Sequence, residues 1–168
     1  MDFRKARTDD LKDIGGLIAM ARKSLHDDGV DQWQKTNPNI EIVKKQLANK
    51  GSYVLEENGK VVGYAFLSPT VEETYTIHED KFKGKNYLVV HTMMVDTSGK
   101  IPSLGTKFME KVLDFAQKSA RDSLRIDTHE DNFRMRGLLA KFDFRELGQI
   151  HIDEDGTPKA RICYEKVL

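Results

Sequence analysis

The residues with the clearest capacity for chemistry lie in one stretch, Asn86 to Phe115, where an apolar strand pattern breaks into a loop and then an amphipathic helix. The first amides of a helix have no partner within it and carry the positive end of the helix dipole, so anions bind there readily. Lys100 adds a formal charge, and Ser103 and Thr106 add hydroxyl groups. Gly105 lets the backbone approach a ligand closely. The stretch therefore predicts a phosphate site.

Two elements must position this loop: a strand over Tyr87 to Val95 and a helix from Leu104 to about Arg121. The helix is predicted by apolar residues at helical spacing, which are Leu104, Phe108, Val112 and Phe115. Strand, loop and helix follow one another in every α/β fold, and a glycine at a helix start is often only a geometric convenience. Taken alone, the loop leaves this geometric interpretation open beside phosphate binding.

The composition limits the kind of protein that this is. A chain of 168 residues is about the size of one domain, which we expect to span 1–168. Its 27 basic and 27 acidic residues leave no net charge, which argues against a nucleic-acid partner. The longest near-apolar run, Tyr87 to Val95, is too short for a membrane span. The single cysteine, Cys163, and a charged N-terminus predict a soluble, cytoplasmic protein.

The first forty residues predict a short strand and a long helix. Phe3 to Ala6 has a strand pattern, and Thr8 is the expected N-cap of the following helix. That helix buries a stripe of apolar residues, namely Leu11, Ile14, Leu17, Ile18, Ala21 and Leu25. The polar stretch from His26 to Asn39 then predicts a loop with Trp33 as its aromatic anchor.

A second helix and a hairpin are expected next. Asn39 is the predicted cap of the helix, and Gly51 is its predicted end. The Asn58 and Gly59 pair predicts a tight turn that joins strands over 52–55 and 61–67 in antiparallel fashion.

The rest of the chain predicts a long connection and four further elements around those already named. Pro69 to Lys85 is polar and irregular. The further elements are a strand over Leu124 to Thr128, a helix over Phe133 to Phe142, and strands over Phe144 to Ile152 and Arg161 to Val167 joined by a turn over Asp153 to Pro158.

The predicted order is β-α-α-β-β-β-α-β-α-β-β. It indicates an α/β fold with one mixed sheet and helices on both faces. The hairpin signal predicts an antiparallel first half. The strands on either side of the third helix are expected to be parallel, because a crossover helix joins them.

Two blocks of residues within this order share their spacing with a known family. The first is KIPSLG before the third helix, with Lys100, Ser103 and Gly105 at its key positions. The second is NFRMRGLLAKFDF after the next strand, whose key positions are Asn132, Leu139, Asp143 and Phe144. With these blocks and this element order, nearly the whole chain resembles the GNAT superfamily of N-acetyltransferases.

The match is incomplete at several positions. The family's phosphate loop reads Gln/Arg-x-x-Gly-x-Gly/Ala, and here Ser103 replaces the first glycine while Pro102 lacks an N–H. The second block of the family has Asn, Tyr, Gly and Phe at its key positions. Leu139 and Asp143 replace the tyrosine and the glycine here. In many relatives that tyrosine protonates the departing thiolate of coenzyme A, which leucine cannot do.

The resemblance implies acetyl-CoA as the cosubstrate and no metal. The pantetheine arm would pair with the backbone of one splayed strand, as an added strand does, and the loop would hold the pyrophosphate. The cofactor-binding residues implied in this way are Met93, Met94, Val95, Lys100, Ile101, Ser103, Leu104, Gly105, Thr106, Asn132 and Leu139.

Four residues are candidates for acid and base work if the resemblance holds. His91, Asp127 and His129 are candidate bases for an ammonium, and we expect Asp127 and His129 to share one face of a strand. Each of them also has an ordinary structural interpretation, such as a hydrogen-bonded histidine or a loop cap. Tyr164 is a candidate replacement for the missing tyrosine, or a packed aromatic, and solvent is the other proton source.

The sequence thus predicts an N-acetyltransferase that moves acetyl directly from acetyl-CoA to a primary amine of a small molecule or a protein. A monomer or a homodimer is expected. The altered loop and Leu139 leave two alternatives open. One is a non-catalytic module that binds acyl-CoA and serves regulation or interaction, and the other is a protein that does not bind coenzyme A.

Overall fold

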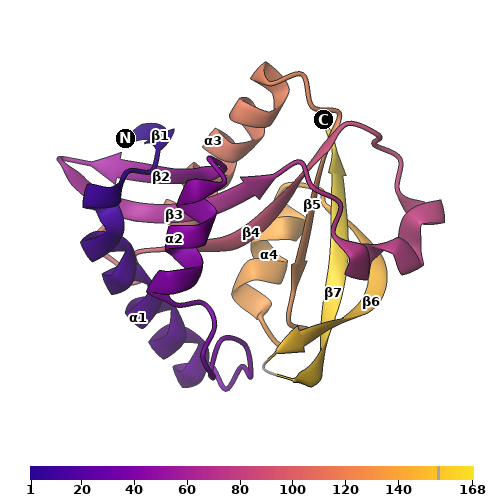
Figure 1. The fold of residues 1–168 in the computed structure, drawn as a ribbon, viewed down its shortest axis with the longest axis horizontal. Helices are drawn as coiled ribbons and strands as arrows, with labels where there is room; N and C mark the ends of the chain where they lie inside the picture. Colours follow the sequence, from indigo (N-terminus) through magenta and orange to yellow (C-terminus); the bar gives the residue numbers. More distant parts are fainter. Residues whose placement is uncertain (155) are drawn as a thin grey trace.

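A computed structural model gives the structure of the protein over residues 1–154 and 156–168 (Figure 1). The strands are β1 (Asp2–Lys5), β2 (Ser52–Glu57), β3 (Lys60–Ser68), β4 (Tyr87–Val95), β5 (Ser123–Thr128), β6 (Arg145–Glu154) and β7 (Thr157–Val167). The helices are α1 (Leu11–Asp27), α2 (Ile40–Ala48), α3 (Leu104–Lys118) and α4 (Phe133–Lys141), and two 3₁₀ segments are η1 (Thr8–Asp10) and η2 (Glu73–Lys81). None of the described helices is long and apolar enough to cross a bilayer.

The seven strands form one mixed sheet in the order β1-β2-β3-β4-β5-β7-β6. β1 to β4 pair antiparallel with their neighbours, as the hairpin signal predicts. β4 and β5 pair parallel, which confirms the expectation for two strands joined through α3. β7 pairs antiparallel with both β5 and β6. The predicted fold class is therefore confirmed.

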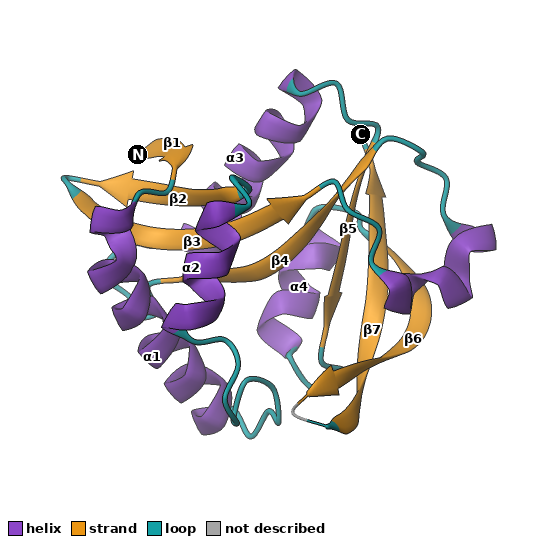
Figure 2. Cartoon of the chain, in the orientation of Figure 1, coloured by secondary structure: helices purple, strands orange, loops and turns teal. Residues whose placement is uncertain are grey.

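Helices cover both faces of this sheet (Figure 2). Successive residues of a strand point to opposite faces, and Val54 and Leu55 of β2 accordingly join different apolar clusters. The Leu55 cluster contains Phe108 of α3 and Leu139 of α4, whereas the Val54 cluster contains Ile14 of α1 together with residues of α2. The two helix pairs therefore pack on opposite faces.

Two local signals in the sequence have the predicted effect. The side chain of Asn39 accepts a hydrogen bond from the amide of Ile42 at 3.0 Å, so it caps α2. Asn58 and Gly59 have φ angles of 52° and 77°, the left-handed pair that a tight hairpin turn requires. β2 and β3 pair around this turn.

The predicted start of α1 and the predicted end of α2 are wrong. Thr8 begins the 3₁₀ segment η1, and the N-cap of α1 is Asp10. Lys50, with φ of 59°, takes the left-handed position after α2, while Gly51 lies immediately before β2. A Cβ on Gly51 would come within 2.3 Å of the Leu67 carbonyl oxygen, so this glycine serves close backbone approach instead.

The turn of the last hairpin is shorter than predicted. Asp153 pairs with Pro158, and Glu154 pairs with Thr157, so most of the predicted turn is strand. Residue 155, which was also assigned to the turn, lies outside the described residues.

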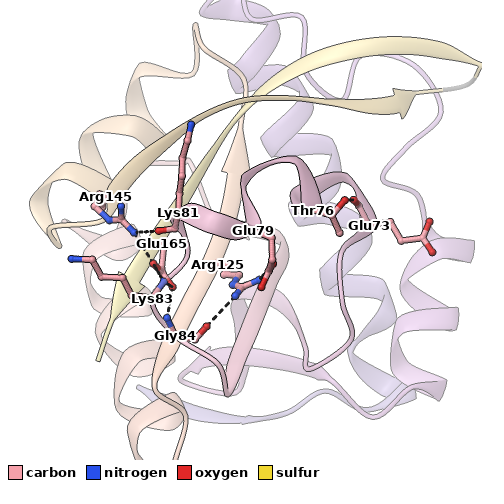
Figure 3. Close-up of polar contacts among 9 residues, drawn as sticks. All are labelled: Glu73, Thr76, Glu79, Lys81, Lys83, Gly84, Arg125, Arg145 and Glu165. Atoms are coloured by element: carbon pink, nitrogen blue, oxygen red, sulfur yellow. Dashed lines mark hydrogen bonds and ion pairs between the residues drawn. The ribbon is translucent and has the colours of Figure 1, made fainter.

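The connection between β3 and β4 contains η2 and is anchored at its end by buried charges (Figure 3). The carboxylate of Glu165, whose side chain is 0% exposed, accepts hydrogen bonds from the amides of Lys83 and Gly84 at 3.0 and 2.9 Å. It also pairs with Arg145 at 3.0 Å. The guanidinium of Arg125 donates to the Gly84 carbonyl at 3.0 Å. These contacts fix η2 over the β5 and β7 part of the sheet.

Candidate functional site

β4 and β5 separate partway along their length (Figure 1). Their parallel pairing covers three positions and ends at Val89 and Arg125, although β4 continues to Val95 and β5 to Thr128. Thr92, with φ of 53°, lies where the pairing of β4 with β3 shifts register, which bends the strand. Beyond Val89, therefore, the β4 backbone on the β5 side has no strand to pair with.

A cavity of about 430 Å³ lies in this opening. Its strand walls are formed by Met93, Met94 and Val95 of β4 and by Ile126, Asp127 and Thr128 of β5. The start of α3, one side of α4, the C-terminal part of α1 and the loop with Gln32 and Trp33 complete the lining. This volume is in the range of small-molecule sites, and the lining is largely apolar with a few polar groups, as is typical of such sites.

The loop before α3 brings a helix N-terminus to the cavity. Hydrogen bonding within α3 begins with the Lys107 amide, which donates to the Ser103 carbonyl at 3.0 Å, so the preceding amides are free of the helical ladder. Ser103 has φ of 56° and ψ of 30°, a left-handed conformation in which a glycine would be relaxed. Ser103, Gly105 and Thr106 line the cavity.

The remaining loop residues are less closely engaged. Ile101 and Leu104 line a neighbouring cavity, which also includes Gly105. Lys100 is exposed and lies outside both linings. It is near Asp96, whose pKa is lowered mainly by a hydrogen bond from Ser98 and further by the lysine charge.

Asp127 is the acidic group in the lining of the cavity. The hydroxyl of Tyr75, from η2, donates a hydrogen bond to its Oδ1 at 2.6 Å. Burial raises the pKa of Asp127, and this hydrogen bond and the charge of His91 partly oppose the rise. Such a carboxylate takes up a proton more readily than an exposed aspartate does.

His91 approaches Asp127 from β4 but faces another groove. This groove, of about 660 Å³, is also lined by Phe66 and Glu72. Nε2 of His91 lies 4.0 Å from Oε2 of Glu72, and its ring stacks on that of Phe66. Burial lowers the pKa of His91, against the charges of Asp127 and Glu72, so the neutral ring is favoured. The structure thus brings His91 and Asp127 near one another from two strands.

His129 does not share a strand face with Asp127, because β5 ends at Thr128. Its Nδ1 accepts a hydrogen bond from the Asp131 amide at 3.1 Å, within the turn before α4. The expectation of a shared face is wrong for this reason.

Tyr164 and Leu139 also lie outside the cavity lining. The Tyr164 hydroxyl accepts from Arg136 Nε at 3.1 Å and donates to Glu146 at 3.2 Å, beside a different surface pocket. Leu139 is fully buried in the apolar cluster under α3 and α4. Cys163 is equally buried, and burial raises the pKa of its thiol to about 12.

Asn132 links three elements at the cavity edge. Its Oδ1 accepts from the Met135 amide at 3.1 Å, which caps α4. Its Nδ2 donates at 3.0 Å to Oε1 of Gln32, which lies 100 positions earlier in the chain. Gln32 also accepts from Thr128 at 3.3 Å, so it holds the α1–α2 loop to the end of β5.

Several residues of the site escape prediction from the sequence. Gln32, Arg134 and Lys141 reach it through contacts with distant segments. Each belongs to a residue type that occurs commonly on a protein surface or core, and no spacing pattern distinguishes them. Trp33, which stands in a predicted loop, lines the cavity, whereas Tyr75, within η2, is buried.

Comparisons with known proteins agree with this arrangement. Residues 18–144, more than half of the chain, match the model of the acetyltransferase (GNAT) family. A GNAT-family acetyltransferase structure from Streptococcus agalactiae has a TM-score of 0.84 and 26% identity, covering 99% of this chain and 95% of that one. No curated protein matches significantly.

Two further structures share the fold. The ribosomal-protein-alanine N-acetyltransferase of Brucella melitensis has a TM-score of 0.70 and 19% identity, with full coverage (100%) of both chains. A Salmonella typhimurium structure that contains its cofactor acetyl-CoA has a TM-score of 0.70 and 16% identity, covering 99% of this chain and 93% of that one. The splayed sheet and the family match lead to one conclusion: this chain belongs to the GNAT family of acetyltransferases.

Proposed function

We propose that this protein transfers acetyl from acetyl-CoA to a primary amine within the cavity between β4 and β5. The observation that carries the proposal is the end of β4–β5 pairing at Val89 and Arg125, which opens a cavity with Asp127 in its lining. Few sites combine an unpaired strand edge, a helix N-terminus and a buried carboxylate, and this chemistry uses all three.

The proposed cosubstrate site uses the backbone of Met93 to Val95 and the start of α3. Unpaired amides and carbonyls of a strand edge pair with an extended amide-containing chain, which describes the pantetheine arm. The amides from Leu104 to Thr106 point out of the helix start and attract the pyrophosphate. Ile101, Ser103 and Asn132 complete the proposed contacts, and Lys100 contributes charge from outside.

Asp127 is our proposed general base. The acceptor enters as an ammonium, and the Asp127 carboxylate removes one proton. The nitrogen lone pair then forms a bond to the acetyl carbonyl carbon, and the carbon–sulfur bond breaks with its electron pair leaving on sulfur. The newly bonded nitrogen loses its second proton to solvent, which gives the neutral amide. The raised pKa of Asp127 suits this task because the carboxylate is a stronger base than an exposed aspartate.

His91 is the alternative base. Its lowered pKa keeps it neutral and able to accept a proton near pH 7. It lines the outer groove with Glu72, whereas Asp127 lines the cavity itself, and this difference favours Asp127. His129 is a weaker proposal because its ring is engaged with Asp131.

Solvent is the proposed source of the proton for the departing thiolate. A thiol has a pKa near 8.5, so assistance is helpful but not required near neutral pH. Tyr164 would have to leave Arg136 and Glu146 to supply this proton. Leu139, at the position of the family's tyrosine, carries no proton to give.

A non-catalytic acyl-CoA-binding module is the second candidate, favoured by the buried Leu139. A panel of primary amines, assayed for free thiol released from acetyl-CoA, separates the two functions. Acceptor-dependent thiol release supports the enzyme. Acetyl-CoA binding without release by any amine, including protein N-termini, supports the module. No binding at all contradicts both.

A further inference from the structure

One face of α4 runs along the first turn of α3. Arg134, Leu138 and Lys141 are four and three residues apart, so their side chains share a face of the helix. A Cβ on Gly105 would lie 3.7 Å from Cδ2 of Leu138. Nζ of Lys141 donates to Oγ1 of Thr106 at 3.2 Å. Two cations of α4 therefore flank the helix start that we assign to the pyrophosphate.

Arg134 forms an ion pair with Asp28. Nε of Arg134 lies 2.6 Å from Oδ2 of Asp28, and Nη2 lies 3.0 Å from Oδ1, which is a two-pronged contact. Asp28 is the C-cap residue of α1, and residues of α1 and of α4 both line the cavity. The pair therefore joins two elements that border the proposed cosubstrate site.

The position of this pair relates it to the phosphate loop. Arg134 lines both the cavity between β4 and β5 and a neighbouring cavity of about 570 Å³. Gly105 lines both cavities as well, and the second also includes Asp28, Ser98 and Gly99. The guanidinium of Arg134 thus shares two hollows with the start of α3. Its side chain is 64% exposed, so a bound anion can reach it.

We propose that Arg134 is a phosphate-binding residue of the coenzyme A site and that Asp28 is a built-in competitor for it. This inference rests on the proposed function. A guanidinium binds the two oxygens of a phosphate as it binds those of a carboxylate, and the phosphate carries more charge. The guanidinium is the exposed member of the pair, 64% against 15% for Asp28, so a phosphate can reach it from solvent and compete with the carboxylate.

The altered phosphate loop offers fewer groups to a phosphate than the family's loop does, and Arg134 compensates for this loss. Pro102 lacks the N–H that another residue would offer, and Lys100 is exposed outside the lining. Arg134 supplies charge and two parallel donors at the same helix start. Asp28 then lowers the affinity, because it occupies the Nε and Nη2 donors that a phosphate would otherwise use.

The test is calorimetric titration of coenzyme A into the wild-type protein and its variants. We expect Arg134→Gln to weaken binding about tenfold, because two charge-assisted hydrogen bonds are lost. Arg134→Lys keeps the charge but not the paired donors, so its affinity for coenzyme A should lie between those of the wild type and Arg134→Gln. Asp28→Asn should tighten binding several-fold, since it removes the competitor. A purely structural pair predicts the opposite sign for Asp28→Asn.

Asp27→Asn is the matched control. It removes a carboxylate charge at the position next to Asp28, and this carboxylate belongs to an exposed ion pair with Lys23. Its effect should stay within about twofold. Equal tightening by both aspartate variants would contradict competition and indicate a general charge effect. The double variant Asp28→Asn with Arg134→Gln should bind like Arg134→Gln alone, because Asp28 acts only through Arg134.

Dephospho-CoA distinguishes the two phosphate sources. Persistence of the Arg134→Gln effect with this ligand assigns the contact to the pyrophosphate, and its loss assigns the contact to the 3′-phosphate. If the wild type binds coenzyme A and releases thiol with an amine, and the Arg134→Gln variant binds coenzyme A equally well, this inference alone is overturned. Absence of wild-type binding overturns the proposed function with it.

Discussion

Tyr75 and Asp127 join η2 to β5 through a hydrogen bond of 2.6 Å between the phenol oxygen and Oδ1. Tyr75 is 1% exposed, so it can reach no solvent partner in place of the carboxylate. The contact fixes one oxygen of Asp127 and leaves the other for the cavity that this residue lines. η2 is in this way part of the proposed catalytic arrangement, although it lies far from the phosphate loop.

Tyr75→Phe should shift the pH dependence of kcat/KM. The hydrogen bond from Tyr75 lowers the pKa of Asp127, so its removal raises that pKa further. The proposed base must be deprotonated, and the acidic limb of the profile should therefore move to higher pH. Tyr164→Phe is the matched control outside the cavity, and it should leave the limb in place. Equal pH profiles for the wild type and Tyr75→Phe would show that Tyr75 does not influence the pKa of the general base.

Asp127→Asn should abolish most acceptor-dependent thiol release, with a loss of at least about 100-fold, as expected for removal of a general base. His91→Gln should cost much less. Acetyl-CoA binding, followed by calorimetry, should survive in both variants. A larger loss from His91→Gln would transfer the role of base to the histidine.

The same Asp127→Asn variant should be more stable at neutral pH. Burial raises the pKa of Asp127, so the folded protein binds this proton more tightly than the unfolded chain does. The stability of the wild type should accordingly rise as the pH falls through the raised pKa, down to the ordinary aspartate value of about 3.9. Thermal melts of both proteins between about pH 4 and about pH 8 measure this difference in stability. An Asp127→Asn variant that is less stable than the wild type at about pH 7 would contradict this prediction.

Local signals in the sequence are enough to predict most of this fold. The Asn39 cap, the Asn58 and Gly59 turn and the helical stripe of α3 each act through neighbours along the chain, and each has the expected place. Lys50 shows the limit of such signals. It adopts the left-handed conformation next to a glycine because Gly51 is needed against the Leu67 carbonyl, a contact with another strand.

The candidate site is less predictable because its contacts are long-range. The phosphate loop is a continuous segment, so its residues can be recognised together. Tyr75 and Asp127 lie 52 positions apart, and Asp28 and Arg134 lie 106 positions apart. Their pairing depends on how η2, α1 and α4 pack, which spacing along the chain does not encode. His129 fails for a different reason: it follows Thr128, the last residue of β5, so the alternation of a strand no longer determines where its side chain lies.

Leu139→Tyr should destabilise the fold and not restore the family's acid. Leu139 is 0% exposed in the main apolar cluster, and a larger side chain there costs about 1–3 kcal/mol. Denaturant unfolding measures this cost. Thiol release at saturating substrate should not increase. An increase in kcat without loss of stability would mean that the new hydroxyl reaches the thiolate and that protonation limits turnover.

Glu165→Ala should loosen the anchor of η2. Its buried carboxylate holds two backbone amides and Arg145, and removal of one partner from such a group costs about 3–5 kcal/mol. Asp114→Ala, which breaks an exposed pair with Lys118, is the control and should change the free energy of unfolding by less than about 1 kcal/mol. Similar values for both variants would show that Glu165 is not the anchor.

Amide hydrogen exchange with and without acetyl-CoA tests the central claim most directly. Binding in the cavity between β4 and β5 predicts slower exchange at the unpaired edge, Met93 to Val95, and at the start of α3, Leu104 to Thr106. The paired strands β1 and β2 should be unaffected. Protection at both segments on addition of acetyl-CoA is the result that we predict. Unchanged exchange at both segments while acetyl-CoA is bound would contradict the account.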